Sequence, residues 1–204
     1  MLGVSDYGAF VLAFVLLLLL PGPGNLALVT STGQGGWRGG MASVAGLLLG
    51  DQVLMWLTVA GVAALLQSRP ALFIGLQGLG AAYLAWMGWR MIWPHTGGAP
   101  AVRVRHGRYF ADTFMITLLN PKAIMFYFAF FPQFIDPLKH QGLITFAFMA
   151  VTVVVLGFIY CTGVVWLTHT MAERLRANPG AVRWLERLAG ACLMGFGVRL
   201  LWGA

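Results

Sequence analysis

Asp51 and Lys122 are the ionisable residues whose positions in the sequence could support chemistry. Each lies within an apolar segment, where a charged side chain costs about 2.5–3.5 kcal/mol to insert into a bilayer and therefore faces the protein interior or a cavity. A carboxylate in such a place can carry a proton or hold a cation, or it can hydrogen-bond a neighbouring helix. The Lys122 amine can serve a transport pathway, cap backbone carbonyls that a proline has freed, or do both.

Two proline-containing breaks accompany these residues. Pro21-Gly22-Pro23-Gly24-Asn25 and Asn120-Pro121-Lys122-Ala123 each interrupt an apolar run, because proline removes a backbone donor and clashes with a carbonyl one turn back. Non-helical backbone within a membrane persists only where it is buried in protein or lines a wet cavity. We therefore predict substrate-binding or gating roles for Pro21, Gly22, Pro23, Gly24, Asn25, Asn120, Pro121 and Lys122, and proton coupling for Asp51.

The helices that restart after these breaks, near Asn25 and Ala123, would point free N–H groups at an anion such as a carboxylate. Asp51 would then receive a proton or a positively charged group, and Lys122 would compete for it. Gly46 and Gly50 precede Asp51 and are four residues apart. This spacing of small residues lets another helix approach closely.

Six apolar runs must position these residues, at about 7–30, 41–66, 71–93, 109–135, 143–168 and 185–202. Each is long enough to form a transmembrane helix. The composition agrees, because 59% of the residues are hydrophobic and 9% are charged, against about 45–50% and 25% in soluble domains. The sequence predicts an all-α membrane protein, and it excludes a disordered chain and a soluble nucleic-acid-binding protein.

The distribution of positive charge predicts the orientation of the helices. The connections 31–40, 94–108 and 169–187, with the adjoining helix end at Arg90, carry most of the Lys and Arg residues. We therefore expect these connections to face the cytoplasm and both termini to lie outside. The residues concerned are Arg38, Arg90, Arg103, Arg105, Arg108, Arg174, Arg176, Arg183 and Arg187.

An internal repeat follows from the ends of the third and sixth runs, where residues 88–93 and 197–202 share the pattern G-x-R-x-x-W. A chance match between two helices rich in Gly, Leu and Trp is the alternative. Three spans per half would give the halves opposite topology in the membrane. We predict one transmembrane domain, 1–204, composed of repeat 1 (about 7–93), a cytoplasmic loop (94–108) and repeat 2 (about 109–204), with a broken first helix in each repeat.

Other polar residues suggest no further chemistry. The four histidines form no ligand cluster, and Cys161 and Cys192 lie among apolar neighbours, whereas a thiol-redox carrier would need a reactive pair with polar neighbours. Asp112 lies one turn after Arg108, which predicts a structural ion pair. We expect no enzymatic activity, no metal site and no cofactor.

LPGPGNL at 20–26, GLLLGD at 46–51 and LLNPKAIMFYFAFFPQFID at 118–136 resemble the LysE/RhtB family of amino-acid exporters, most closely its leucine-exporter (LeuE-type) branch. The resemblance covers about residues 7–202 and implies a six-helix carrier of the bacterial inner membrane, driven by the proton gradient. Gly24 stands where many members of the family have Asn. Thr113 and Thr117 stand where some members have Gly and Asn. The matching positions are Pro21, Gly22, Pro23, Asp51, Asn120, Pro121, Lys122 and Ala123.

We therefore expect an inner-membrane, proton-coupled antiporter that exports small neutral, leucine-like amino acids or their analogues. The alternative is a divalent-metal exporter or another small-solute carrier of the same superfamily, although a single intramembrane acid offers a divalent ion few ligands. A structural membrane protein would leave the paired breaks unexplained. The expected partners are an amino-acid substrate and the lipid bilayer, without nucleic acid. Glycine-rich helix faces permit a homodimer without requiring one.

Overall fold

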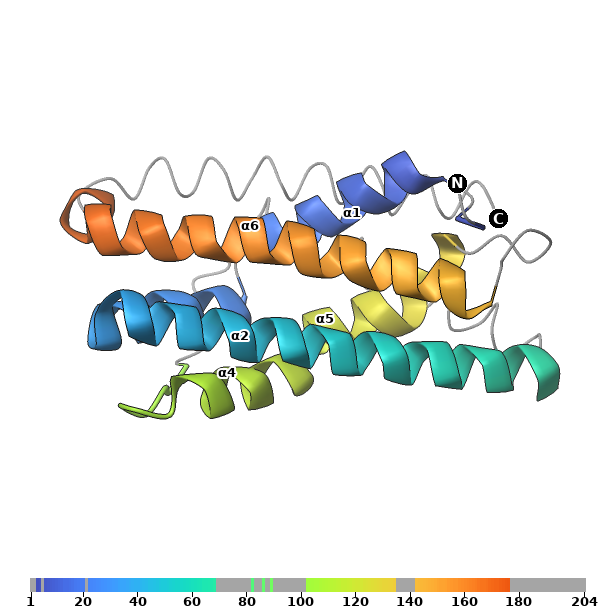
Figure 1. Cartoon of the computed structure of the whole chain (residues 1–204), viewed down its shortest axis with the longest axis horizontal. Coiled ribbons are helices and arrows are strands. Elements are labelled where there is room, and N and C mark those ends of the chain that lie inside the picture. The colour runs from blue at the N-terminus through green and yellow to red at the C-terminus, as the bar shows by residue number, and fades with distance from the viewer. Residues whose placement is uncertain are drawn as a thin grey trace.

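The computed structural model of the chain describes residues 3–4, 6–20, 22–68, 82, 86, 89, 102–134 and 142–176. Every regular element in this part is a helix, as the sequence predicts, and the helices lie lengthwise in one bundle (Figure 1). The predicted spans at 71–93 and 185–202, and Cys192, lie wholly or almost wholly outside the described residues. The elements are α1 (Tyr7–Leu19), α2 (Pro23–Ser68), α4 (Tyr109–Leu118), α5 (Pro121–Met125), a π-helical turn (Phe126–Phe130), a 3-10 turn (Phe131–Phe134) and α6 (Leu143–Arg176).

The first predicted span is broken where the sequence places the break. α1 begins after Asp6, whose carboxylate accepts a hydrogen bond from the Ala9 N–H at 2.9 Å. It ends at Leu19, and α2 begins at Pro23, two residues earlier than the restart expected near Asn25. Proline suits the first turn of a helix because its missing N–H has no helical partner there.

α2 reverses direction at Gly36, whose φ of 59° lies in the left-handed region that glycine adopts most readily. A Cβ atom on Gly39 would come 2.6 Å from the carbonyl oxygen of Ser31, although residues eight apart in a straight helix are separated by about 12 Å. α2 therefore has a first arm (23–35) and a second arm (37–68) that fold back on each other. The connection predicted at 31–40 is a turn at one residue, with helix on both sides.

The second broken span runs from α4 through α5 into the π-helical and 3-10 turns. α4 ends at Leu118, and α5 begins at Pro121 with Asn120 as its N-cap. The break predicted at Asn120-Pro121 is therefore present. The wide turn after Met125 changes the helical register of the aromatic residues that follow, and such π-helical turns occur often at functional sites.

An apolar core fills the space between α1, the turns that follow α5, and α6. Phe10 contacts Phe131 and Phe134 edge-on, and Phe14 lies against Phe126. A smaller cluster joins both arms of α2 to α6 and contains Cys161, which is a buried free thiol. Its other buried members are Leu28, Val44, Leu47 and Val165.

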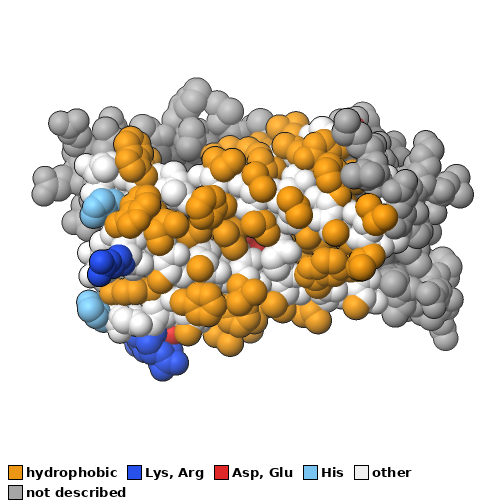
Figure 2. All heavy atoms as spheres, viewed as in Figure 1, with side chains coloured by type: hydrophobic (Ala, Val, Ile, Leu, Met, Phe, Trp, Pro, Cys, Tyr) orange, Lys and Arg blue, Asp and Glu red, His pale blue; other side chains and the backbone are white. Residues whose placement is uncertain are grey.

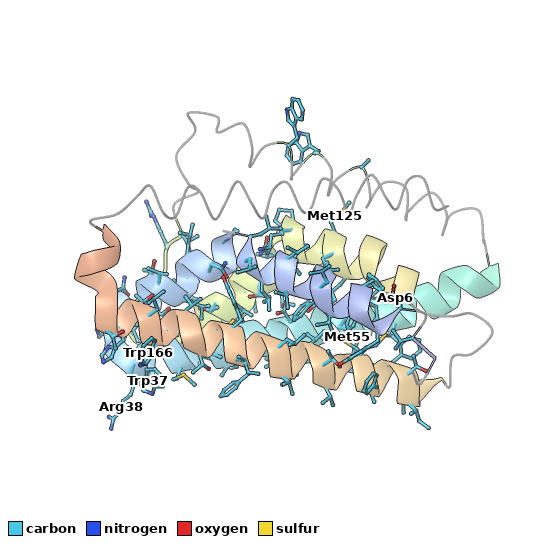
Figure 3. The ribbon with its side chains drawn as sticks, turned by 90° about the horizontal axis from the view of Figure 1, so that it is seen from above. Asp6, Trp37, Arg38, Met55, Met125 and Trp166 are labelled. Atoms are coloured by element: carbon cyan, nitrogen blue, oxygen red, sulfur yellow. The ribbon has the colours of Figure 1, made fainter. Side chains whose placement is uncertain are left out.

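The outer surface of the described part is apolar over most of its length. Figure 2 shows hydrophobic side chains along the bundle and positively charged side chains gathered at one end. That end holds the reversal of α2, with Trp37 and Arg38, and Trp166 of α6, whereas Asp6 lies at the opposite end (Figure 3). By length and composition, Leu143–Thr170 and the stretch Pro23–Gly61, which contains the reversal at Gly36, are candidates to cross a membrane. An apolar surface of this extent is typical of contact with lipid.

Candidate functional site

The two helix breaks meet inside the bundle, and Lys122 connects them. Its ammonium group donates hydrogen bonds to the carbonyl oxygens of Leu17 and Leu20, both at 2.7 Å. A Cβ atom on Gly22 would lie 3.5 Å from Nζ, so the lysine lies directly across the first break. These carbonyls belong to the last turn of α1, where no helical donor can reach them. Lys122 therefore caps α1 from the second broken span.

Asn25 caps the same helix end from within its own span. Its Nδ2 donates to the carbonyl oxygens of Leu18 at 3.0 Å and Leu20 at 3.1 Å. The same nitrogen lies 3.2 Å from the hydroxyl oxygen of Tyr160, which brings α6 to the break. Side chains thus replace the backbone donors that the two prolines cannot supply.

The second break uses its own residues. The Asn120 side-chain oxygen accepts the Lys122 N–H at 3.1 Å, and the Asn120 carbonyl accepts the Ile124 N–H at 3.0 Å. This is the usual N-cap arrangement, in which a side-chain oxygen takes one of the free N–H groups at the start of a helix. One of the N–H groups expected to face a substrate is therefore already occupied in this conformation.

A cavity of about 40 Å³ lies where the two breaks meet. Gly24, Asn25, Asn120 and Lys122 line it from the breaks, and Asp51 lines it from the second arm of α2. Thr117 of α4 completes its polar lining. At about 10–15 Å³ for each water-sized probe, this volume holds roughly three water molecules and no amino acid. In this conformation the cavity is therefore too small to hold an amino-acid substrate.

Asp51 is the acidic group of the cavity and is only 6% exposed. Its carboxylate forms no ion pair with a described residue, because the Lys122 ammonium is directed at the α1 carbonyls. The Tyr127 hydroxyl, on the π-helical turn, faces the same carboxylate. A buried carboxylate without a fixed cationic partner is free to bind a proton or an ammonium group.

Gly46 and Gly50 bring α4 into close contact with α2, as their spacing predicts. A Cβ atom on Gly46 would overlap the carbonyl oxygen of Phe110, and one on Gly50 would lie 2.8 Å from Cβ of Thr117. Ser43 lies on α2 between the reversal at Gly36 and Gly46. Its hydroxyl group is hydrogen-bonded to that of Thr113 on α4 at 2.5 Å. This contact sets the position of Thr117 beside Asp51.

The prediction of an ion pair between Asp112 and Arg108 is wrong, because the partner of Asp112 is Arg105. Asp112 instead binds the Arg105 guanidinium at 2.6 Å and accepts the Arg105 backbone N–H at 2.8 Å. The reason is that α4 begins only at Tyr109, so Arg108 lies outside the regular helix, and the preceding loop folds back to place Arg105 over the carboxylate. The hydrogen bonds to Asp112 raise the pKa of the Arg105 guanidinium, so that this pair stays charged.

The chain matches the family model described as LysE type translocator over residues 15–203. The chain belongs to this family. An uncharacterized membrane protein of Pseudomonas aeruginosa is 36% identical over 207 residues, which cover 98% of this chain and 96% of the relative. A leucine efflux protein of Enterobacter sp. (strain 638) is 34% identical, with 97% and 96% covered, and one of Klebsiella pneumoniae is 32% identical, with 97% and 95% covered. No solved structure matches the chain.

Membership of the LysE type translocators confirms the resemblance seen in the sequence and the assignment to membrane transport. The translocator is thus an integral membrane protein, in agreement with the two long apolar helices. In the part that the structure describes, no group of three His, Cys, Asp or Glu side chains could hold a metal ion.

Five of the predicted site residues of this translocator border the same cavity: Gly24, Asn25, Asp51, Asn120 and Lys122. Gly22 lies against Lys122, Pro23 and Pro121 begin the restarted helices, and Pro21 lies outside the described residues.

Sequence reasoning did not assign Tyr127 and Tyr160 to the site, and it noted Thr117 only as a departure from the family pattern. A hydroxyl-bearing residue within an otherwise apolar span is the signal that could have indicated all three.

Proposed function

We propose that this LysE type translocator exports small neutral, leucine-like amino acids across the bacterial inner membrane in exchange for protons. The names of the relatives from Enterobacter and Klebsiella, leucine efflux proteins, support an amino acid as the substrate. The observation that carries the proposal is the buried Asp51 carboxylate, which lines the cavity between the two helix breaks without an ion-pair partner among the described residues.

Competition for this carboxylate couples the two fluxes. The Asp51 carboxylate binds either a proton or the substrate ammonium group, so binding of one requires release of the other. The N–H groups at the starts of the restarted helices, beside Asn25 and Ala123, receive the substrate carboxylate. Lys122 holds the end of α1 and thereby leaves the aspartate available. A dibasic amino acid would bring a second positive group to a site with one carboxylate, which favours neutral substrates.

Transport requires this cavity to widen and to open alternately to the two sides of the membrane. We propose six spans in two inverted repeats, about 7–93 and 109–204, that move about this cavity, with the loop 94–108 in the cytoplasm and both termini outside. The meeting of a broken helix from each repeat at one cavity supports this arrangement. The gathering of positive side chains at one end of the described part supports the assigned orientation.

The test is leucine flux in proteoliposomes, with and without a pH gradient. The wild-type protein should exchange leucine and should accumulate it when the gradient is imposed, whereas Asp51→Asn should lose both activities. Asp6→Asn is the matched control, because Asp6 is exposed and asparagine caps a helix as well as aspartate does. Gradient-driven transport by Asp51→Asn at the wild-type rate would refute the coupling role. Absence of leucine flux through intact wild-type protein would refute leucine as the substrate.

A further inference from the structure

A row of hydroxyl groups runs along the face of α4 that contacts α2. Tyr109, Thr113 and Thr117 are four residues apart, so each lies about 6 Å along the helix from the next. All three are buried. The Tyr109 ring lies against Gly35 and Gly39, Thr113 bonds Ser43, and Thr117 contacts Gly50. The row begins at the cavity that contains Asp51 and ends where α4 begins, next to Arg105 and Asp112.

The hydroxyls of this row do not make the hydrogen bonds that threonines usually make in helices. Thr32, Thr58, Thr152 and Thr170 each bond the carbonyl four residues earlier in their own helix, as is common for helical threonine. Thr113 bonds Ser43 on α2 instead, and Thr117 Oγ1 is buried without a hydrogen-bond partner among the described residues.

The far end of the row has two more unsatisfied hydroxyls. Tyr109 OH and Ser31 Oγ are both buried, and neither has a hydrogen-bond partner in the part of the chain that the structure describes. Gly39 lies between their residues, because a Cβ atom there would meet both the Ser31 carbonyl and the Tyr109 ring. A buried hydroxyl without a hydrogen bond is unfavourable, and water is the partner that usually satisfies such a group.

The spacing of the two threonines in the row suits bridging water. Two O–H···O bonds of about 2.8 Å in sequence span about 5.6 Å, which is close to the rise of about 6 Å between Thr113 and Thr117 on α4. We propose that Thr117, Thr113 with Ser43, and Tyr109 with Ser31 form a hydrated proton path between Asp51 and the end of the bundle that carries Arg105. This inference rests on the proposed function, in which Asp51 exchanges protons.

In this path the proton leaves the Asp51 carboxyl group for the first water, and each water or hydroxyl accepts one proton and passes on another. The net change is one proton moved from the carboxyl group to bulk water, leaving a carboxylate. The Ser43–Thr113 bond suits this relay because either oxygen can be the donor. The other polar groups that face Asp51 or line its cavity do not belong to the row; they are Asn25, Asn120, Lys122 and Tyr127.

The test separates proton transfer from substrate binding. Leucine–leucine exchange needs no net movement of protons, whereas transport driven by a pH gradient needs one proton release per cycle. Thr113→Val keeps the shape of the side chain but removes its hydroxyl. Gradient-driven transport by this variant should fall at least about tenfold, while exchange should stay within about twofold of wild type. Ser43→Ala removes the same hydrogen bond from the other helix and should act in the same way.

Thr58→Val is the matched control, since Thr58 is equally buried on α2 and bonds its own helix at Leu54. It should leave both rates unchanged. Equal loss of both rates in Thr113→Val and Ser43→Ala would mean a packing role, and unchanged rates would mean no role; either outcome overturns the path. If Asp51→Asn still responds to the gradient, the proposed function fails, and the path fails with it. If only Asp51→Asn loses the response, the path alone is overturned.

Discussion

The two broken spans satisfy their interrupted backbones in different ways. At the break between α1 and α2, the free carbonyls of Leu17 and Leu20 depend on Lys122, which lies about a hundred residues away in the sequence. At the break between α4 and α5, Asn120 bonds the N–H of Lys122, two residues away. The first break has a local cap in Asn25 but also needs the second broken span beside it, whereas the second break is stabilised locally.

The two spans also differ in how they contact the second arm of α2. Gly24 in the first span faces the end of the flexible Leu47 side chain, at 3.2 Å from a Cβ atom placed there. In the second span, the backbone of Phe110 lies directly against Gly46. A side chain can change its rotamer to accommodate a new atom, but a helix backbone can only move as a unit. We therefore expect the contact at Gly24 to tolerate an added side-chain atom and the contact at Gly46 not to tolerate one.

Removal of the long-range cap should have the largest effect. Lys122→Met removes two hydrogen bonds, leaving the Leu17 carbonyl without its side-chain donor and the Leu20 carbonyl with the Asn25 amide alone. Hydrogen bonds to charged groups contribute about 1.5–3 kcal/mol each. We expect a loss of about 3 kcal/mol or more, seen as a lower Tm in detergent and loss of leucine flux. Arg103→Met removes a positive charge from an exposed loop residue and should leave Tm unchanged. If Lys122→Met has the wild-type Tm, the two breaks are independent.

A methyl group at the tight backbone contact should have the next largest effect. Gly46→Ala places Cβ on the Phe110 carbonyl oxygen and forces α4 away from α2, at a cost of about 1–3 kcal/mol. Gly33→Ala is the control, because a Cβ atom there meets nothing within 4 Å. Thermal unfolding of both variants measures the difference, and equal Tm values would contradict the backbone contact.

The local cap should matter less than the long-range cap. Asn120→Ala removes the bond to the Lys122 N–H and should cost about 1 kcal/mol, the usual value for an N-cap. Asn120→Asp keeps an N-cap oxygen and serves as the control in the same unfolding measurement. A loss as large as that of Lys122→Met would show that the second break is not locally stabilised.

Gly24→Ala should have the smallest effect. The alanine gains about 0.5–1 kcal/mol from its better helix propensity, and this offsets the small displacement of Leu47. Stability should therefore change by less than about 0.5 kcal/mol in either direction, measured as Tm beside Gly46→Ala. A loss equal to that of Gly46→Ala would remove the distinction between the two contacts.

Much of this site could be predicted from the sequence because proline and glycine act on the backbone at their own positions. The breaks at 21–25 and 120–122 follow from missing N–H groups, and the contact at Gly46 and Gly50 follows from the absence of a side chain. The reversal at Gly36 was less precisely predictable, because Gly33, Gly35, Gly39 and Gly40 lie nearby in the sequence and any of them could have adopted the φ that turns the chain.

The identities of the partners could not be predicted in this way. The sequence by itself determined where the helices break and which helix faces carry small residues. It also determined that Asp51 and Lys122 lie within apolar segments. Only the tertiary structure decided that Lys122 bonds Leu17 and Leu20, that Arg105 and not Arg108 binds Asp112, and that Thr117 lies beside the Asp51 cavity. The physical reason is that the partners of a side chain depend on distances between packed helices, which the spacing of residues along one helix does not contain.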